Sequence, residues 1–250
     1  SSPSSYKTTS VKDGDDYVIN GRKCFITNGG VADFYIVTAM TDKSKGVKGM
    51  SAFYVEKGTA GLSVGNEENK MGIRTSNTTD VVFEDMRVPA SALIGKEGEG
   101  FKIAMQTLDM ARAIMGIGAV GVAQRAIDEA VAYSKQRVTF GQPIGKFEAI
   151  QFMIADMEIK TETARQMSLH ALKLQEEGLP YGKESAIAKC YGGDIAVQVA
   201  LDAIQILGGY GYSREYPVEK LLRDAKIFQI YEGTNQVQRM VISRAVMGKF

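Results

Sequence analysis

The chain lacks an excess of either charge and lacks any long apolar run. Lys and Arg number 30 against 29 Asp and Glu, which leaves a net charge of +1 over 250 residues. Because binding to nucleic-acid phosphates needs a concentrated basic surface, nucleic acid is not expected as the main partner. No apolar run approaches the length of a membrane span, and the polar opening SSPSS is not a secretory signal, so no membrane partner is expected.

Cysteine is also scarce. Cys24 and Cys190 are far apart, and neither forms a CxxC motif or has a histidine at ligand spacing. Neither a disulfide framework nor a zinc site is therefore indicated, and no metal is predicted. A reducing compartment is the simpler inference from this pattern.

The first hundred residues have the pattern of β-strands. Runs rich in β-branched and aromatic residues stand at 16–20, 24–27, 33–40, 50–55 and 80–84. We expect the first two runs to form a hairpin that turns at Gly21. The sequence VP at 88–89 closes this part of the chain.

After the glycine-rich segment 95–100 the apolar residues recur at three- and four-residue spacing, which is typical of helices. Helices are predicted over residues 101–137, 147–177, 183–207, about 218–223 and about 234–246. Long helices joined by short loops favour an antiparallel bundle. We therefore predict an α+β fold, with a barrel-like β-sheet domain over 1–97 and a helical bundle domain over 98–250.

One motif suggests a dinucleotide site but stands in the wrong context. GIGAVG at 116–121 fits G-x-G-x-x-G, yet that fingerprint requires a strand before it and a helix that begins within it. Here helical pattern precedes and follows the glycines. We interpret them as small residues that let one helix pass close to a neighbour or a ligand.

A carboxylate stands in a loop directly before the last predicted helix. Glu232 follows Ile230 and Tyr231, so we expect it to be partly desolvated, as suits a general base. Gly233 permits a backbone shape or a close ligand approach that a Cβ would hinder. Thr234 is the predicted N-cap of the helix. These residues alone leave two interpretations open, a catalytic base or a carboxylate that stabilises the positive end of the helix dipole.

Several short segments in a fixed order carry a family resemblance. They are FITNGG at 25–30, KMGIR at 70–74, VFED at 82–85 with VP at 88–89, GFK at 100–102, LDMAR at 108–112, RVTFG at 137–141, QILGG at 205–209 and IYEGT at 230–234. With these segments the chain resembles the acyl-CoA dehydrogenase family over essentially its whole length, and most of all the short- and medium-chain members.

The resemblance implies an FAD enzyme. The predicted cofactor-binding residues are Phe25, Ile26, Thr27, Arg137, Phe140, Gln205, Gly209, Thr234 and Gln236. Phe25 and Thr27 are expected at the flavin ring, and Arg137 and Phe140 at the FAD of an adjacent subunit.

The resemblance also implies an acyl-CoA substrate. Asp109 and Arg112 are expected to hold its CoA portion, where an arginine fork pairs with phosphate oxygens or stacks on adenine. Gly233 and Ser1 are further predicted substrate contacts, and Ser1 aligns with the last position of a flavin-cradling loop. A complete family member begins with a helical domain that this sequence does not include, so we expect either a fragment or a second chain that supplies the missing half.

The activity implied is α,β-dehydrogenation of a short- or medium-chain acyl-CoA to trans-2-enoyl-CoA. Glu232 takes the α-proton while a hydride leaves the β-carbon for flavin N5. Isovaleryl- and long-chain-type relatives place their base at the position of Ala111, which cannot act as one. The alternatives are a non-catalytic truncated homologue or assembly subunit, and an enoyl-CoA reductase.

The resemblance further implies partners and a location. Electrons are expected to pass to an electron-transferring flavoprotein, and the chain to form a homo-oligomer, a dimer of dimers. We expect it in the cytoplasm of a bacterium or in the mitochondrial matrix of a eukaryote.

Overall fold

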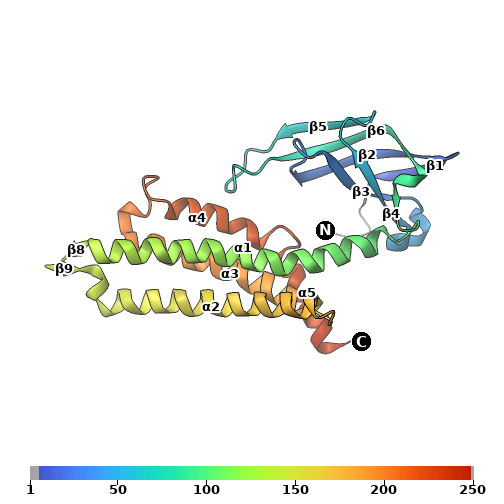
Figure 1. Cartoon of the computed structure of the whole chain (residues 1–250). Helices are drawn as coiled ribbons and strands as arrows, with labels where there is room; N and C mark the ends of the chain where they lie inside the picture. Colours follow the sequence, from blue (N-terminus) through green and yellow to red (C-terminus); the bar gives the residue numbers. More distant parts are fainter. Residues whose placement is uncertain (1–5, 249–250) are drawn as a thin grey trace. The chain divides into compact units, whose positions relative to one another are not determined.

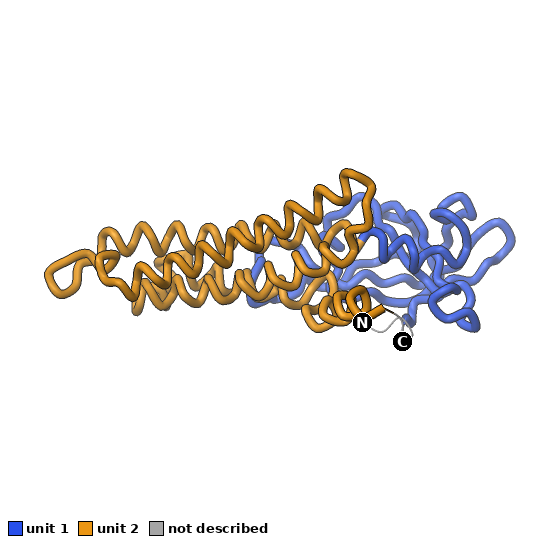
Figure 2. Tube along the Cα trace, turned by 90° about the horizontal axis from the view of Figure 1, so that it is seen from below, with its two compact units in different colours: residues 1–107 blue, residues 108–250 orange. Residues whose placement is uncertain are grey.

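The computed structural model describes residues 6–248. The chain divides into two compact units, residues 1–107 and 108–250 (Figure 2). The division lies inside the long helix α1, Gly100–Gln136. The domain boundary expected at residue 97 stays a prediction.

The first unit is built on a seven-stranded sheet with the order β5-β6-β2-β1-β3-β4-β7. Its strands are β1 (Thr9–Asp13), β2 (Asp16–Thr27), β3 (Phe34–Met40), β4 (Met50–Glu56), β5 (Leu62–Glu67), β6 (Thr78–Pro89) and β7 (Leu93–Ile94). Neighbouring strands are antiparallel except β1 and β3, which are parallel. The strands β5 and β7 end the order without pairing to each other, so within the described residues the sheet is open and the barrel-like closure is not confirmed.

The hairpin predicted at Gly21 is wrong. The strand β2 runs through Gly21, and the turn that pairs β1 with β2 lies at Gly14, where φ is 62°. Gly21 instead stands at a shift in the β2–β6 register, and a Cβ there would lie 2.7 Å from Thr8 Cα. Inside a strand, glycine often marks a bulge or a close approach of another backbone segment.

One face of the sheet holds the core of this unit. Alternation along β3 buries Tyr35, Val37 and Ala39, while Phe34 and Ile36 stay exposed. The buried cluster consists of Tyr17, Ile19, Tyr35, Val37, Ala39, Phe53, Val55, Val81, Phe83, Met86 and Val88.

The second unit is a bundle of long helices. It contains most of α1 together with α2 (Glu148–Glu176), α3 (Gly182–Leu207), α4 (Val218–Ala225) and α5 (Asn235–Met247). A small hairpin of β8 (Val138–Thr139) and β9 (Gln142–Pro143) joins α1 to α2, so these two helices run antiparallel side by side (Figure 1). Short 3₁₀ turns cover Lys43–Gly49, Ala90–Ala92, Ile144–Lys146, Gly208–Tyr210 and Lys226–Gln229. The predicted α+β class is confirmed.

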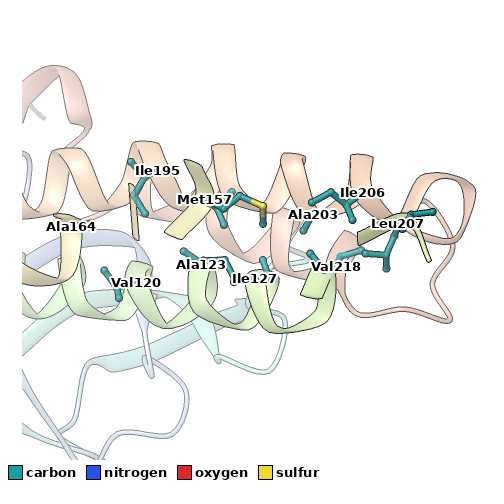
Figure 3. Close-up of a cluster of buried hydrophobic side chains, with 14 residues drawn as sticks. Val120, Ala123, Ile127, Met157, Ala164, Ile195, Ala203, Ile206, Leu207 and Val218 are labelled. Carbon is teal, nitrogen blue, oxygen red and sulfur yellow. The ribbon is translucent and has the colours of Figure 1, made fainter. Parts of the chain in front are cut away.

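The bundle core lies between three helices. Figure 3 shows Val120, Ala123 and Ile127 of α1 facing Met157 of α2 and Ile195 of α3. Met157 and Ala123 are fully buried. None of the helices within residues 6–248 is long and apolar enough to cross a membrane.

The glycines of the GIGAVG segment lie inside α1, which is continuous there. A Cβ at Gly116 would stand 2.5 Å from Ser168 Oγ and 3.1 Å from the carbonyl of Ala188, whereas a Cβ at Gly121 would meet nothing within 4 Å. Gly116 therefore lets α1 pass close to Ser168 of α2 and to the backbone of α3, and the packing interpretation is confirmed at this glycine but not at Gly121.

We expect Gly116→Ala and Gly121→Ala to change stability in opposite directions. The first overpacks the contacts with Ser168 of α2 and with the α3 backbone, and it costs about 1–3 kcal/mol. The second improves helix propensity in an exposed turn and stabilises by up to about 1 kcal/mol. Thermal unfolding of the two variants beside the wild type measures this, and equal shifts of the melting temperature would contradict the packing interpretation.

Candidate functional site

Glu232 lies in a short loop between the 3₁₀ turn at Lys226–Gln229 and α5, and its side chain is half-buried. Its backbone is left-handed, with φ of 56°, and Gly233 follows with φ of 88°. A non-glycine residue in this conformation costs roughly 1–2 kcal/mol. Such a backbone persists only where its surroundings hold it, and it is common at functional sites.

Three buried side chains from three helices hold this loop. Arg112 of α1 donates from Nε to the Glu232 carbonyl at 3.5 Å. Gln238 of α5 donates from Nε2 to the carbonyls of Glu232 and Gly233 at 3.2 and 2.9 Å. Lys189 of α3 donates from Nζ to the Gly233 carbonyl at 2.7 Å. The donors are 5%, 0% and 1% exposed, respectively, so water competes little for these bonds.

Sequence reasoning missed Lys189 and Gln238. The signal for Lys189 was present, because this lysine interrupts the otherwise small and apolar run SAIAKCYGG at 185–193. Gln238 carries no such signal, since its burial follows only from the packing of α5 against α3.

Gly233 has a steric reason for lacking a side chain. A Cβ there would lie 2.7 Å from Gln238 Nε2, in addition to the strain of its positive φ. The sequence prediction that this glycine permits a special backbone shape is therefore confirmed.

The start of α5 offers unpaired donors. Thr234 is the N-cap, as predicted, and its Oγ1 accepts from the Val237 N–H at 3.3 Å. The N–H groups of Asn235 and Gln236 belong to the first turn and have no partner within the helix. Nor does the Glu232 N–H make a hydrogen bond to any of residues 6–248. These amides can donate hydrogen bonds to carbonyl or phosphate oxygens of a ligand.

A polar network ties the first residue of α5 to α3. Asp194 accepts hydrogen bonds from Asn235 and Gln229, each at 2.8 Å, and from Arg239 at 2.7 Å. Burial alone would raise the pKa of Asp194, but these hydrogen bonds hold that pKa below its usual value. Burial, with a smaller contribution from the Glu232 charge, raises the pKa of Tyr231 to about 12.

The two predicted CoA contacts pair with each other. Arg112 NH1 donates to Asp109 Oδ1 at 2.6 Å, and Ser185 Oγ donates to the Asp109 carbonyl. The guanidinium of Arg112 is thus turned to the Glu232 loop rather than to solvent, and half-buried Asp109 lies beside it. The assignment of both residues to CoA stays a prediction.

Other predicted cofactor residues gather at the opposite end of the bundle, by the β8–β9 hairpin (Figure 1). A cavity of about 590 Å³ is lined there by Arg137 and Gly209 together with Tyr210, over whose ring the Arg137 guanidinium stands at 5.9 Å. Gln205 is exposed on the last turn of α3, and Phe140 is left-handed and 97% exposed. The chain does not bring these residues together with Glu232.

The remaining predicted contacts belong to the first unit. Phe25 is left-handed with φ of 56°, at a register shift of β2, and is 70% exposed. Thr27 is also exposed, whereas the Ile26 side chain packs on the core of the sheet. Ser1 lies outside the described residues. Within those residues no cluster of His, Cys, Asp and Glu side chains suits a metal ion.

Known proteins share this architecture and the sequence that forms it. Residues 1–86 match the acyl-CoA dehydrogenase middle domain, and residues 98–247 match the acyl-CoA dehydrogenase C-terminal domain. The chain is 52% identical over 237 residues to the short-chain-specific acyl-CoA dehydrogenase of Clostridium acetobutylicum, covering 95% of this chain and 62% of the relative.

Two solved structures resemble this chain in both fold and sequence. Butyryl-CoA dehydrogenase from Megasphaera elsdenii superposes with a TM-score of 0.97 at 52% identity, over 98% of this chain and 64% of that one. A chain from a structure on the electron transferring flavoprotein of Acidaminococcus fermentans and flavin-based electron bifurcation gives 0.97 at 54% identity, over 98% and 65%. The chain thus spans less than two thirds of each relative's length. It belongs to the acyl-CoA dehydrogenase family.

Proposed function

We propose that the protein is an FAD-dependent acyl-CoA dehydrogenase that converts a short- or medium-chain acyl-CoA to the trans-2-enoyl-CoA, with Glu232 as the base. The observation that carries this proposal is the strained, half-buried loop at Glu232, whose carbonyls are held by three buried donors while its own N–H has no partner within residues 6–248.

The loop supplies two of the groups that the reaction needs. The Glu232 carboxylate accepts the proton from the carbon next to the thioester, a role worth about two to four powers of ten in rate. The N–H of the same residue donates to the thioester carbonyl, where negative charge develops as the proton leaves. An oxyanion donor of this kind contributes about 3–4 kcal/mol. Bound FAD supplies the acceptor for the hydride that leaves the β-carbon.

Several exposed groups fit FAD, a large anionic cofactor with an aromatic ring. Phe25 presents an aromatic face in a left-handed bulge that leaves it open to solvent. The free N–H groups at the start of α5, beside Thr234 and Gln236, suit phosphate oxygens. Arg137 and Phe140 offer a cation and a second exposed ring.

The proposed partners follow from the same family. We propose an electron-transferring flavoprotein as electron acceptor and a dimer of dimers as the assembly, in the bacterial cytoplasm or the mitochondrial matrix. Large exposed apolar side chains on the bundle are consistent with an oligomer, because a partner subunit would remove them from water. They include Phe140, Phe152, Ile159 and Leu201.

Glu232→Gln is expected to keep FAD and acyl-CoA binding while the dehydrogenation rate falls by about two to four powers of ten, because only the proton acceptor is removed. Single-turnover bleaching of the flavin by butyryl-CoA measures this. Glu176→Gln, at an exposed position near the end of α2, is the matched control and should turn over normally. Normal bleaching in the Glu232 variant would mean that another group is the base.

Arg137→Ala is expected to weaken FAD retention about tenfold, the effect of losing roughly 1.4 kcal/mol of binding free energy. The flavin-to-protein ratio after dilution and gel filtration measures it. Arg125→Ala removes an equally exposed arginine that only pairs with Glu129 on α1, and it should retain FAD. Equal flavin content in both variants would remove Arg137 from the cofactor site.

A further inference from the structure

We propose that Lys189 is a positioning residue for Glu232, because its buried ammonium holds the Gly233 carbonyl and the Asn235 side chain and thereby fixes the backbone that aims the carboxylate. The catalytic meaning of this inference rests on the proposed function. Its structural part, a loop held by a lysine of α3, does not.

Lys189 is buried at a position where a cation is costly. It is 1% exposed, and among residues 6–248 no carboxylate lies within 4 Å of its Nζ. An ammonium in a protein interior gives up its hydration, and without an adjacent counter-ion no ion pair offsets that loss. A group that is this unfavourable for folding and faces a candidate site is a candidate for a functional role.

Both hydrogen bonds of the ammonium go to the segment that carries the base. Nζ donates to the Gly233 carbonyl at 2.7 Å and to Asn235 Oδ1 at 2.9 Å. Asn235 is further bound to α3, because its Nδ2 donates to the Cys190 carbonyl at 3.0 Å and to Asp194 Oδ1 at 2.8 Å. The residues on the C-terminal side of Glu232 are therefore fastened to one helix.

Lys189 makes the shortest of the bonds to the two strained carbonyls. Gln238 offers a neutral donor to the Gly233 carbonyl at 2.9 Å, and the contact from Arg112 to the Glu232 carbonyl is long, at 3.5 Å. Charge-assisted hydrogen bonds are roughly twice as strong as neutral ones. Without Lys189, we expect the peptide between Glu232 and Gly233 to relax from its left-handed shape. A misplacement of about 1 Å at a reacting group can lower the rate 100-fold.

Lys189→Met tests this directly, since methionine fills similar space without a donor. We expect hydrogen exchange of the Tyr231, Val237 and Gln238 amides, which flank the loop, to become at least about tenfold faster. The kcat for dehydrogenation should fall about 10- to 100-fold while KM changes little, because the lost geometry concerns the base and not substrate affinity.

Thr161→Val is the matched control. Thr161 is fully buried in α2 and donates to the Met157 carbonyl, so its loss perturbs the same bundle away from the loop. It should change neither the exchange of the three flanking amides nor kcat. The inference is overturned if Lys189→Met leaves both readouts at the wild-type value, or if the control moves them equally. Exchange is measured without substrate and does not depend on catalysis. If Lys189→Met accelerates exchange but the wild type shows no dehydrogenase activity, the proposed function is refuted and the positioning of the loop by Lys189 stands.

The dependence of kcat on pH is a further measurement, and a purely structural role of Lys189 in packing would not change it. Burial lowers the pKa of Lys189 to about 8, with smaller effects from Cys190, Arg112, Asp194 and Glu232. Below that pH the charged ammonium holds the loop, and above it the neutral amine holds it with weaker bonds. The wild-type kcat should therefore fall above about pH 8, and Lys189→Met should lack this decline.

The Cys190 thiol lies next to Lys189 and is tested as an alternative cause of the fall in kcat near pH 8. Burial raises the pKa of Cys190 above its ordinary value, so Cys190→Ala should keep the fall in kcat near pH 8. A decline that persists in Lys189→Met and disappears in Cys190→Ala would assign it to the thiol and overturn the role of the lysine charge.

Discussion

The hydrogen bonds that hold the left-handed backbone at Glu232 and Gly233 are the constraint on which the candidate site depends. That shape is unfavourable in isolation, and it is retained because Arg112, Lys189 and Gln238 donate hydrogen bonds to its two carbonyl oxygens. Each donor comes from a different helix, so the loop has its shape only when α1, α3 and α5 are in register. The close approach of Gly116 on α1 to α3 serves this register.

The bundle separates two sets of functional candidates. Arg112 lies in α1, and Arg137 directly follows the end of that helix at Gln136. The 24 residues from Arg112 to Gln136 span about 36 Å at about 1.5 Å per residue. No single contact reaches across that distance. The surface at Arg137 and Phe140 and the loop at Glu232 are thus distinct surfaces of one chain, which supports the proposal that the first one serves an adjacent subunit.

The sequence predicted the helices well and the strands less well, for physical reasons. Apolar spacing along 101–137 marks α1 to within one residue, because the three- and four-residue spacing recurs over many turns and single exceptions do not hide it. The strand β5 escaped prediction because it is mostly exposed and polar. The prediction of a turn at Gly21 was wrong because glycine is common both in turns and at strand bulges, and the sequence alone does not distinguish the two. Thr234 was predictable as a cap, since capping is local in sequence, whereas the donors Lys189 and Gln238 come together with the loop only in the tertiary fold.

The most direct test of the account is proton abstraction measured apart from hydride transfer. A butyryl-CoA analogue with sulfur in place of the β-carbon can lose an α-proton but cannot lose the hydride. In deuterium oxide, NMR should show the purified FAD-loaded protein exchanging the α-hydrogens of this analogue for deuterium, and the Glu232→Gln variant should show no exchange above background. Undiminished exchange in that variant would contradict the account, because the held carboxylate would then not be the base.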